Sequence, residues 1–293
     1  MIVRVYRLCF LLLPLLSVQA YADPFTLGAA SSFAVLGGST VTNTGSTTVA
    51  GDLGVSPGSS CTGFPTPCTG GPGAVSGTIY AGNAGGAQSD ATASYNALSF
   101  MAATGNLTGT DLGGLTLTPG VYKFDSSAQL TGALTLNAEG NNDAVWVFEI
   151  GSTLTTASDS SLVFTNLGPS PNDGLFWLVG SSATLGATTA FEGNILASDS
   201  ITLITGATID CGRALAQTGA VTMDTNTVSI GCANSTLEDT SGLSGGLYQS
   251  SNGGTPSPVP EPGSFVLLGS GLVVLAGVVR RQRQDLSRAV RQQ

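Results

Sequence analysis

Histidine is absent from the chain, and only 9% of its 293 residues are charged. Without histidine, serine–histidine and cysteine–histidine nucleophile pairs cannot form, and zinc lacks its usual nitrogen ligand. Basic side chains are especially scarce, because between Asp23 and Pro260 only Lys123 and Arg213 stand against sixteen acidic residues. This acidic balance argues against nucleic acid and anionic membrane surfaces as partners of that part of the chain.

Grouped catalytic residues are also missing. Solenoid glycosidases and lyases need clustered carboxylates, or a carboxylate with a basic partner. Here the candidates occur singly in the sequence, as Asp52, Asp111, Asp125, Glu149, Glu192 and Asp210. The stretch 54–58 (GVSPG) matches a nucleophile elbow, but Pro57 removes a backbone N–H and no histidine can act as base. We expect no enzyme and no cofactor, unless three carboxylates converge in a groove.

A short repeat is the most informative feature that is present. The triplet 183–185 (ATL) recurs eighteen residues later at 201–203 (ITL), and 221–223 (VTM) continues the pattern. The run 193–197 recurs nineteen residues later, because Cys211 is inserted. This period suits one turn of a β-solenoid, whose rungs stack and bury each other's apolar rows. Alternation of Val, Leu and Ile with Thr and Ser elsewhere supports a mainly β fold.

One segment departs from the strand pattern. Residues 81–104 are rich in alanine, and a helix is predicted to begin near Ala87, because the preceding glycines weaken its first turns. Its apolar spacing extends to Ala102. The runs 144–150 and 175–179 are apolar almost without alternation, which predicts strands buried on both faces beneath that helix. Residues 56–79, rich in Gly and Pro, are expected to form a loop that caps one end.

Residues 1–22 resemble a signal peptide, as described below, and their removal leaves four cysteines: Cys61, Cys68, Cys211 and Cys232. Export to an oxidising compartment favours disulfides over a zinc site, whose ligand spacing is not matched. Three pairings are possible. Cys61 with Cys68 would close a Pro/Gly loop, and Cys211 with Cys232 would join successive rungs, whereas the other two pairings would link the early loop to the late rungs.

Both ends of the chain resemble export signals. Residues 1–22 have the basic start, apolar run and small-residue cleavage site of a signal peptide. Residues 249–263 predict a flexible linker, 264–283 an apolar segment closed by arginines, and 284–293 a cytoplasmic tail. Pro260, Glu261 and Pro262, followed by that segment, closely resemble the PEP-CTERM sorting signal. The resemblance implies reading by an exosortase, delivery to the cell surface, and membrane contact only through this segment.

Two stretches, 44–47 and 205–208, read Thr-Gly-x-Thr. Outward residues two apart on a strand lie about 6.6 Å from each other, and stacked rungs lie about 4.8 Å apart. Threonine offers a methyl and a hydroxyl on a stiff stem, so such an array is rigid before it binds anything. An ordered array of this kind can arrange water in an ice-like layer. The alternative is that threonine is simply a favoured residue on a wet strand face.

The segments 30–56, 115–124, 144–157 and 180–227 resemble the microbial ice-binding protein family, with GNILA, GRALAQTGAVTMDTNT and SSATLG as the most similar phrases. The resemblance implies a mainly β fold over residues 23–248. This is a discontinuous right-handed parallel β-solenoid of triangular section with one long flanking α-helix. It also implies a flat face with Thr-Ala/Gly-x-Thr/Asn repeats that binds an ice crystal surface in active members.

These motifs assign ice contact to Thr44, Thr47, Thr205, Thr208, Thr225 and Thr227. Asp224 interrupts the row, and a charge there keeps its own hydration and weakens contact with ice. Because of the family resemblance and the export signals, the leading hypothesis is still an exported ice-binding protein, which inhibits recrystallisation or attaches cells to ice. The second hypothesis is a structural or adhesive surface protein that binds exopolysaccharide. Exposure of Tyr80, Tyr122 or Trp177 on the flat face would favour it, whereas an aromatic-free Thr face would favour ice.

Overall fold

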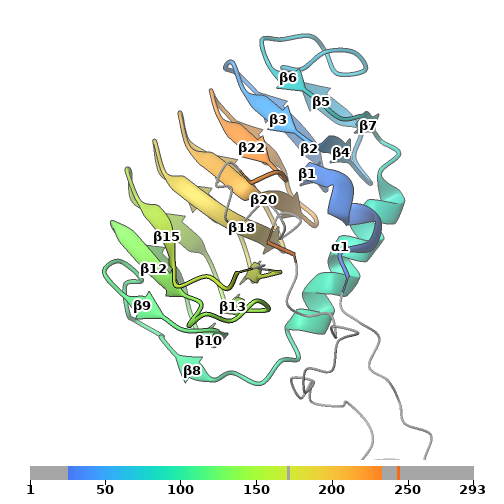
Figure 1. Cartoon of the computed structure of the whole chain (residues 1–293). Coiled ribbons are helices and arrows are strands. Elements are labelled where there is room, and N and C mark those ends of the chain that lie inside the picture. The colour runs from blue at the N-terminus through green and yellow to red at the C-terminus, as the bar shows by residue number, and fades with distance from the viewer. Residues whose placement is uncertain (1–25, 170–171, 233–242, 245–293) are drawn as a thin grey trace, which may run out of the picture. The chain divides into compact units, whose positions relative to one another are not determined.

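The computed structural model describes residues 26–169, 172–232 and 243–244, all within the compact unit Pro24–Pro262. The expected signal peptide, linker, apolar segment and tail lie outside these residues. Within them, every ladder between the named strands is parallel, and the strands form one sheet of fifteen and one of seven. The predicted parallel β-solenoid with a flanking helix is confirmed (Figure 1).

Each rung has three sides, so the stack has three faces. The seven-stranded sheet is one face, in the order β11 (Ala128–Leu130), β14 (Leu154–Thr156), β17 (Ala183–Leu185), β19 (Ile201–Leu203), β21 (Val221–Met223), β2 (Thr40–Asn43) and β5 (Ser60–Thr62). Neighbouring strands of such a sheet lie about 4.8 Å apart. In the five triplets from β11 to β21 the central residue points outward while its neighbours are buried, whereas in β2 and β5 the first and third residues point outward.

The other two faces share the fifteen-stranded sheet, because β18 (Ala190–Ala197) and β20 (Thr208–Ala216) run around the corner between them. The helix face comprises β8 (Gly105–Asn106), β10 (Gly120–Phe124), β13 (Val145–Ile150), β16 (Gly174–Val179), the second halves of β18 and β20, β1 (Phe33–Gly37), β4 (Asp52–Val55) and β7 (Ile79–Ala81). The third face comprises β9 (Thr116–Leu117), β12 (Ala133–Asn137), β15 (Ser161–Thr165), the first halves of β18 and β20, β22 (Thr227–Ser229), β3 (Thr48–Ala50) and β6 (Ala74–Val75).

The bend in β18 and β20 explains the one-residue insertion in the repeat. Glu192 pairs with Asp210 and Gly193 with Gly212, so the register shifts at Cys211. Cys211 has a φ of 50° and Gly193 a φ of 88°, both in the left-handed region. A Cβ on Gly212 would meet the backbone of Gly193, so glycine is required where the two bends stack.

The stack is discontinuous in sequence. Strands β1, β2 and β3, near the N-terminus, pair with β20, β21 and β22, the last described strands of the three faces. The rungs built from residues 33–81 therefore continue a stack whose other rungs run from residue 105 to residue 229. As a result, the apolar interior of the stack is a single hydrophobic cluster, with Trp146 and Trp177 among its fully buried side chains.

Helix α1 (Gly85–Leu98) runs along the helix face, next to the short 3-10 helix η1 (Gly28–Ser32) (Figure 1). It begins two residues before the predicted start at Ala87, and it ends at Leu98 without reaching Ala102. Tertiary contacts fix its first turns despite their glycines, since the Gln88 side chain donates hydrogen bonds to the carbonyls of Ala216 and Gln217. Phe176 and Leu178 of β16 lie in the cluster under the helix, so the prediction of a strand buried on both faces is confirmed.

The cap predicted at residues 56–79 is a rung rather than a loop alone, because β5 and β6 lie within it and pair with β2 and β3.

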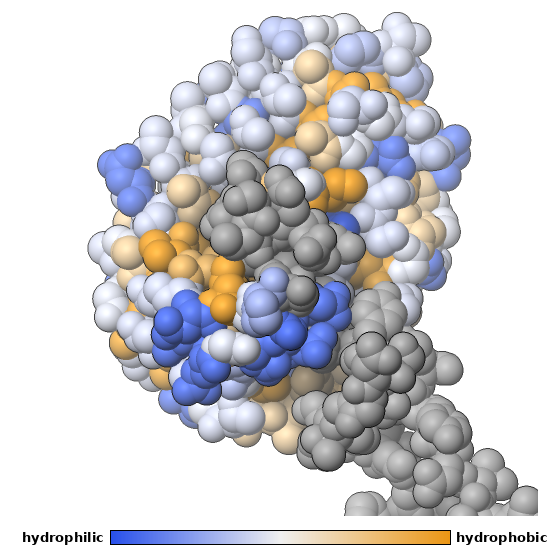
Figure 2. Space-filling model, in the orientation of Figure 1, coloured by the Kyte–Doolittle hydropathy of each residue, from blue (hydrophilic) through white to orange (hydrophobic). Residues whose placement is uncertain are grey.

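Cys61 is bonded to Cys68 inside this rung, and Cys211 to Cys232 beside the corner of β20. Together these two disulfides make up one of the three pairings that the sequence allowed. Among the described residues, no helix is long and apolar enough to cross a membrane. Much of the surface in Figure 2 is pale, as expected for a surface rich in Ser, Thr and Gly.

A short C-terminal piece completes the corner between the helix face and the third face. Leu243 is fully buried, and its carbonyl accepts hydrogen bonds from the Leu175 backbone and from the Asn194 side chain, the latter at 2.8 Å. Arg213, also buried, donates to Asn194 Oδ1 at 2.7 Å and to the Ser31 carbonyl. Segments near the two ends of the described chain, Ser31 and Leu243, are therefore attached to one buried polar pair in the middle of the stack.

We expect Leu243→Ala to lower the free energy of unfolding by about 2–4 kcal/mol, because it removes a fully buried side chain between rungs. Denaturant melts followed by circular dichroism measure this change. Val163→Ala, at a side chain that is 43% exposed on the third face, is the control and should change stability by under about 0.5 kcal/mol. Equal effects of the two variants would show that Leu243 does not stabilise the corner.

Candidate functional site

A row of threonines runs across the centre of the seven-stranded sheet, one on each of six neighbouring strands. Direct pairing in register places Thr155 beside Thr184, Thr184 beside Thr202, and so on to the far end of the sheet. A further bridge joins Thr62 to Thr69. We call this the central Thr row: Thr155, Thr184, Thr202, Thr222, Thr42 and Thr62.

A second row of small residues lies beside the central Thr row, two positions earlier in each rung: Thr153, Ser182, Ser200, Ala220, Thr40 and Ser60. Its members are connected from rung to rung, since the Ser200 backbone N–H donates to Ser182 Oγ and the Ala220 N–H to Ser200 Oγ. The seven strands contain no charged and no aromatic residue. The sheet therefore presents small hydroxyl and methyl groups at about 4.8 Å along the stack and about 6.6 Å along each strand.

The sheet is held rigid from behind. Ile201, Val221 and Val41, which precede the outward threonines, are all fully buried. At the corner, Asn226 donates from its amide to the carbonyls of Ile204 and Ala207, both at 2.9 Å. Because the backbone polar groups at this turn are satisfied inside the protein, the outward side chains are fixed before any ligand arrives.

The residues predicted from the Thr-Gly-x-Thr motifs lie elsewhere. Thr47 is only 1% exposed, and its hydroxyl donates to Asn43 Oδ1 inside the corner, so its assignment to the surface was wrong. The register pairs Thr227 with Thr48 instead. Thr208 and Thr227 pair with each other, but on the third face.

Thr44, Thr205 and Thr225 come together at the corner between the seven-stranded sheet and the third face, around Asp224. Thr205 Oγ1 donates to Asp224 Oδ2 at 2.6 Å, and Thr225 Oγ1 to Asp224 Oδ1 at 3.1 Å. Hydrogen bonds from Thr205, Thr225 and Thr44 hold the pKa of Asp224 below its usual value. The prediction that these three threonines, together with Thr208 and Thr227 on the third face, contact ice stays a prediction.

Sequence reasoning missed the central Thr row, although the signal for it was present. The repeated apolar-Thr-apolar triplets were interpreted as evidence of a period, not as a surface. The central residue of such a triplet must point outward when both of its neighbours are buried. Thr184, Thr202 and Thr222 could therefore have been assigned from the repeat alone.

The aromatic residues that would favour a polysaccharide lie on the helix face. Trp177 is fully buried and stacks on Phe148 with ring centroids 4.0 Å apart. Tyr122 stacks on the other side of Phe148 at 5.6 Å, and Tyr80 packs against Phe33 at 5.2 Å. None of these rings belongs to the seven-stranded sheet.

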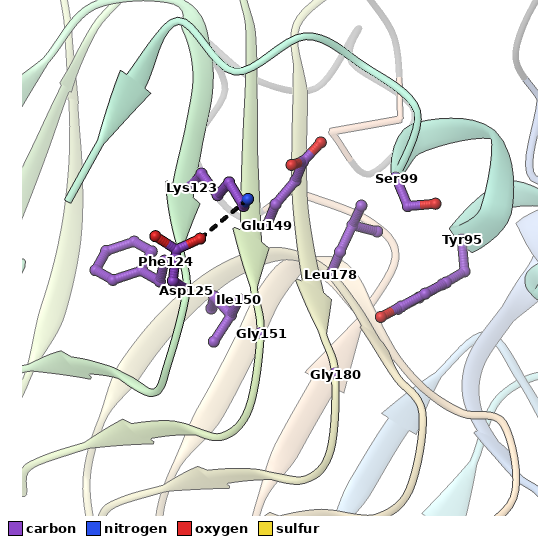
Figure 3. A pocket seen from close by; sticks show the side chains of 10 residues that line it. All are labelled: Tyr95, Ser99, Lys123, Phe124, Asp125, Glu149, Ile150, Gly151, Leu178 and Gly180. Carbon is purple, nitrogen blue, oxygen red and sulfur yellow. Dashed lines mark ion pairs between the residues drawn. The ribbon is translucent and has the colours of Figure 1, made fainter. Parts of the chain in front are cut away.

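An open groove of about 360 Å³ lies at the end of α1, lined by Tyr95, Ser99, Lys123, Asp125 and Glu149 among others (Figure 3). Lys123 Nζ pairs with Asp125 Oδ1 at 3.0 Å, and burial raises the pKa of Glu149. The groove therefore gathers two carboxylates, one of them already paired. This falls short of the three that would have indicated catalysis.

A half-buried carboxyl lies at the bend of β18. Glu192 is paired in register with Asp210 on the next rung, and Glu192 Oε2 has no hydrogen-bond partner among the described residues. Burial, with a smaller contribution from Asp210, raises the pKa of Glu192 to about 8. The carboxyl is therefore protonated in the folded protein at neutral pH.

The parallel solenoid carries one hydroxyl-rich sheet without charged or aromatic residues, and comparison with known proteins identifies its family. A family model described as ice-binding-like matches residues 35–229, and a PEP-CTERM protein-sorting motif matches residues 258–284. The chain belongs to the ice-binding-like family.

Individual relatives agree with this assignment. An ice-binding protein of Nostoc sp. (strain HG1) is 54% identical over 259 residues, which cover 87% of each chain. One from Flavobacterium frigoris (strain PS1) is 34% identical over 71% of this chain and 77% of its own length. Among solved structures, an ice-binding protein from the Antarctic ascomycete Antarctomyces psychrotrophicus aligns with a TM-score of 0.64 at 41% identity. That alignment covers 71% of this chain and 98% of the solved one.

The raised pKa of Glu192 makes stability depend on pH. Because the folded state favours the protonated form, the stabilisation is complete below pH 4.5 and is lost as the pH rises to about 8. We expect the unfolding free energy of Glu192→Gln to exceed that of the parent increasingly over this range, by at most about 1.4 kcal/mol per pH unit. Chemical denaturation at several pH values measures it, with the exposed Glu139→Gln as control. A constant difference between variant and parent would contradict the assignment.

Proposed function

We propose that this chain binds ice through its seven-stranded sheet, with the central Thr row as the contact surface. The observation that carries the proposal is the register of six threonines on six neighbouring strands. Membership of the ice-binding-like family and the relatives named ice-binding proteins support it. The role is that of a non-catalytic binding protein.

The chemistry of the sheet suits ice better than liquid water or a solute. Each threonine offers one methyl, which discourages water from orienting freely, and one hydroxyl, which fixes a water by a hydrogen bond. A regular lattice of such groups arranges the first water layer, and that layer then joins a crystal face. Because β-branched side chains on a sheet that is packed against a buried core lose little freedom on binding, their entropic cost is small.

The polysaccharide alternative receives no comparable support. Sugar-binding surfaces rely on exposed aromatic side chains that stack on the apolar face of a ring. The aromatic residues considered for this purpose are buried or packed on the helix face, whereas the seven-stranded sheet has none.

Export and surface sorting complete the proposal. The PEP-CTERM motif at residues 258–284 supports delivery to the cell surface, with an exosortase as the processing partner and residues 1–22 as the export signal. The last described piece, Leu243–Ser244, is attached at the corner between the helix face and the third face. In a three-sided rung that corner lies opposite the seven-stranded sheet, so attachment through the C-terminus leaves the sheet free to meet ice.

We expect Thr202→Tyr to raise the concentration needed for ice recrystallisation inhibition about ten-fold or more, because a protruding ring holds ice off the neighbouring threonines. The measurement uses residues 24–262, with melting temperature and circular dichroism to confirm folding. Thr227→Tyr on the third face is the matched control and should keep parental activity. If Thr227→Tyr lost activity and Thr202→Tyr kept it, the ice contact would lie at the threonines predicted from the Thr-Gly-x-Thr motifs, and not on the central Thr row.

Attachment through the C-terminus should leave ice binding intact. Beads that carry residues 24–262 through a biotin placed after Pro262 are expected to remain attached to a growing ice surface. Beads that carry the Thr202→Tyr variant in the same way should be released. If the parental beads also failed to attach while the free protein stayed active, surface display facing ice would be contradicted.

A further inference from the structure

Carboxylates stand at both edges of the seven-stranded sheet. At the corner with the third face, Asp224 accepts hydrogen bonds from the hydroxyls of Thr205 and Thr225. At the corner with the helix face, Asp199 accepts them from Ser181 at 3.1 Å and Thr218 at 3.2 Å. Each carboxylate gathers hydroxyls from the rungs around it, so the hydroxyls nearest the edges are already engaged within the protein.

The third face carries a second ordered row, just beyond Asp224. Pairing in register joins Ala190 to Thr208, Thr208 to Thr227, and Thr227 to Thr48. The full third-face row is Ala133, Ser161, Ala190, Thr208, Thr227, Thr48 and Ala74. It shares the spacing of the central Thr row along the stack, and it contains no charged residue.

We propose that Asp224 is a specificity-determining residue that confines ice contact to the seven-stranded sheet and keeps the third-face row from taking part. The inference rests on the proposed ice-binding function and concerns the extent of the same surface. An ionised carboxylate binds its own water in a geometry that differs from that of ice, and removing this water is costly. Ice that grows across the corner must displace the water on Asp224 before it reaches Thr208 and Thr227.

The hydrogen bonds around Asp224 favour a residue that limits the ice-contact surface over one that itself contacts ice. Thr205 and Thr225 use their hydroxyls on Asp224, and these hydrogen bonds favour the charged form of the carboxylate. Asp159 repeats the arrangement on a lower rung of the same corner, where it accepts a hydrogen bond from Thr188 Oγ1. The border therefore follows the corner over several rungs, with Asp224 between the central Thr row and the threonines of the third-face row.

The test is Asp224→Asn, which removes the charge and keeps one oxygen acceptor for a threonine hydroxyl. We expect recrystallisation inhibition at a roughly two-fold or more lower concentration, because an uncharged corner is easier to dehydrate. Labelled protein on a single ice crystal should also stain additional planes. Glu139→Gln makes the same change in net charge at an exposed position opposite the sheet, after β12, and should leave both readouts at parental values.

A double variant identifies where the gain arises. Thr227→Tyr should abolish the gain when added to Asp224→Asn, although it has no effect in the parent. Unchanged activity and unchanged planes in a folded Asp224→Asn protein would overturn the border proposal, and so would a gain that survives Thr227→Tyr. Failure of the underlying ice-binding function is distinguished by Thr202→Tyr, since that variant would then match the parent.

Discussion

The pairing of β2 with β21 is the contact on which the proposed surface depends. It joins the N-terminal rungs to the last rung of the chain and places Thr42 directly beside Thr222. Without this junction the central Thr row would be divided into two short pieces, because four of its threonines belong to residues 155–222 and two to residues 42–62. Ordering two distant parts of the chain costs loop entropy, which is offset by the apolar interior that continues through the junction.

A buried polar cluster lies at the corner opposite the seven-stranded sheet. Arg213 is almost completely buried, which lowers its pKa to about 10, yet it remains charged at neutral pH. It connects the Ser31 carbonyl near the N-terminus to Asn194, and Asn194 connects to Leu243 near the C-terminal end of the solenoid. Hydrogen bonds of a buried charge must be well made, so this cluster selects one way of closing the stack.

The fold could be predicted from the sequence because its signals are periodic. The eighteen-residue spacing of apolar-Thr-apolar triplets predicted the solenoid, and the insertion noted at Cys211 proves to lie at the bend in β20. The positions of the Thr-Gly-x-Thr residues at the corners were harder to predict, because the turns differ in length. From Met223 to Thr227 is four residues, whereas from Asn43 to the equivalent Thr48 is five. A motif aligned without this difference places the buried Thr47 on the surface. The start of helix α1 was misjudged, since contacts from Gln88 in its first turn outweigh the low propensity of glycine.

The discontinuous order of the rungs has a consequence for how such a protein can change in size. Both ends of the stack are formed by internal stretches of the chain, around residues 56–81 and 105–131, while the segments that lead to the two termini leave from rungs in the middle. Rungs can therefore be added or deleted at either end without moving the point of attachment. The number of threonines that face a crystal and the way the molecule is held to its support can thus evolve independently.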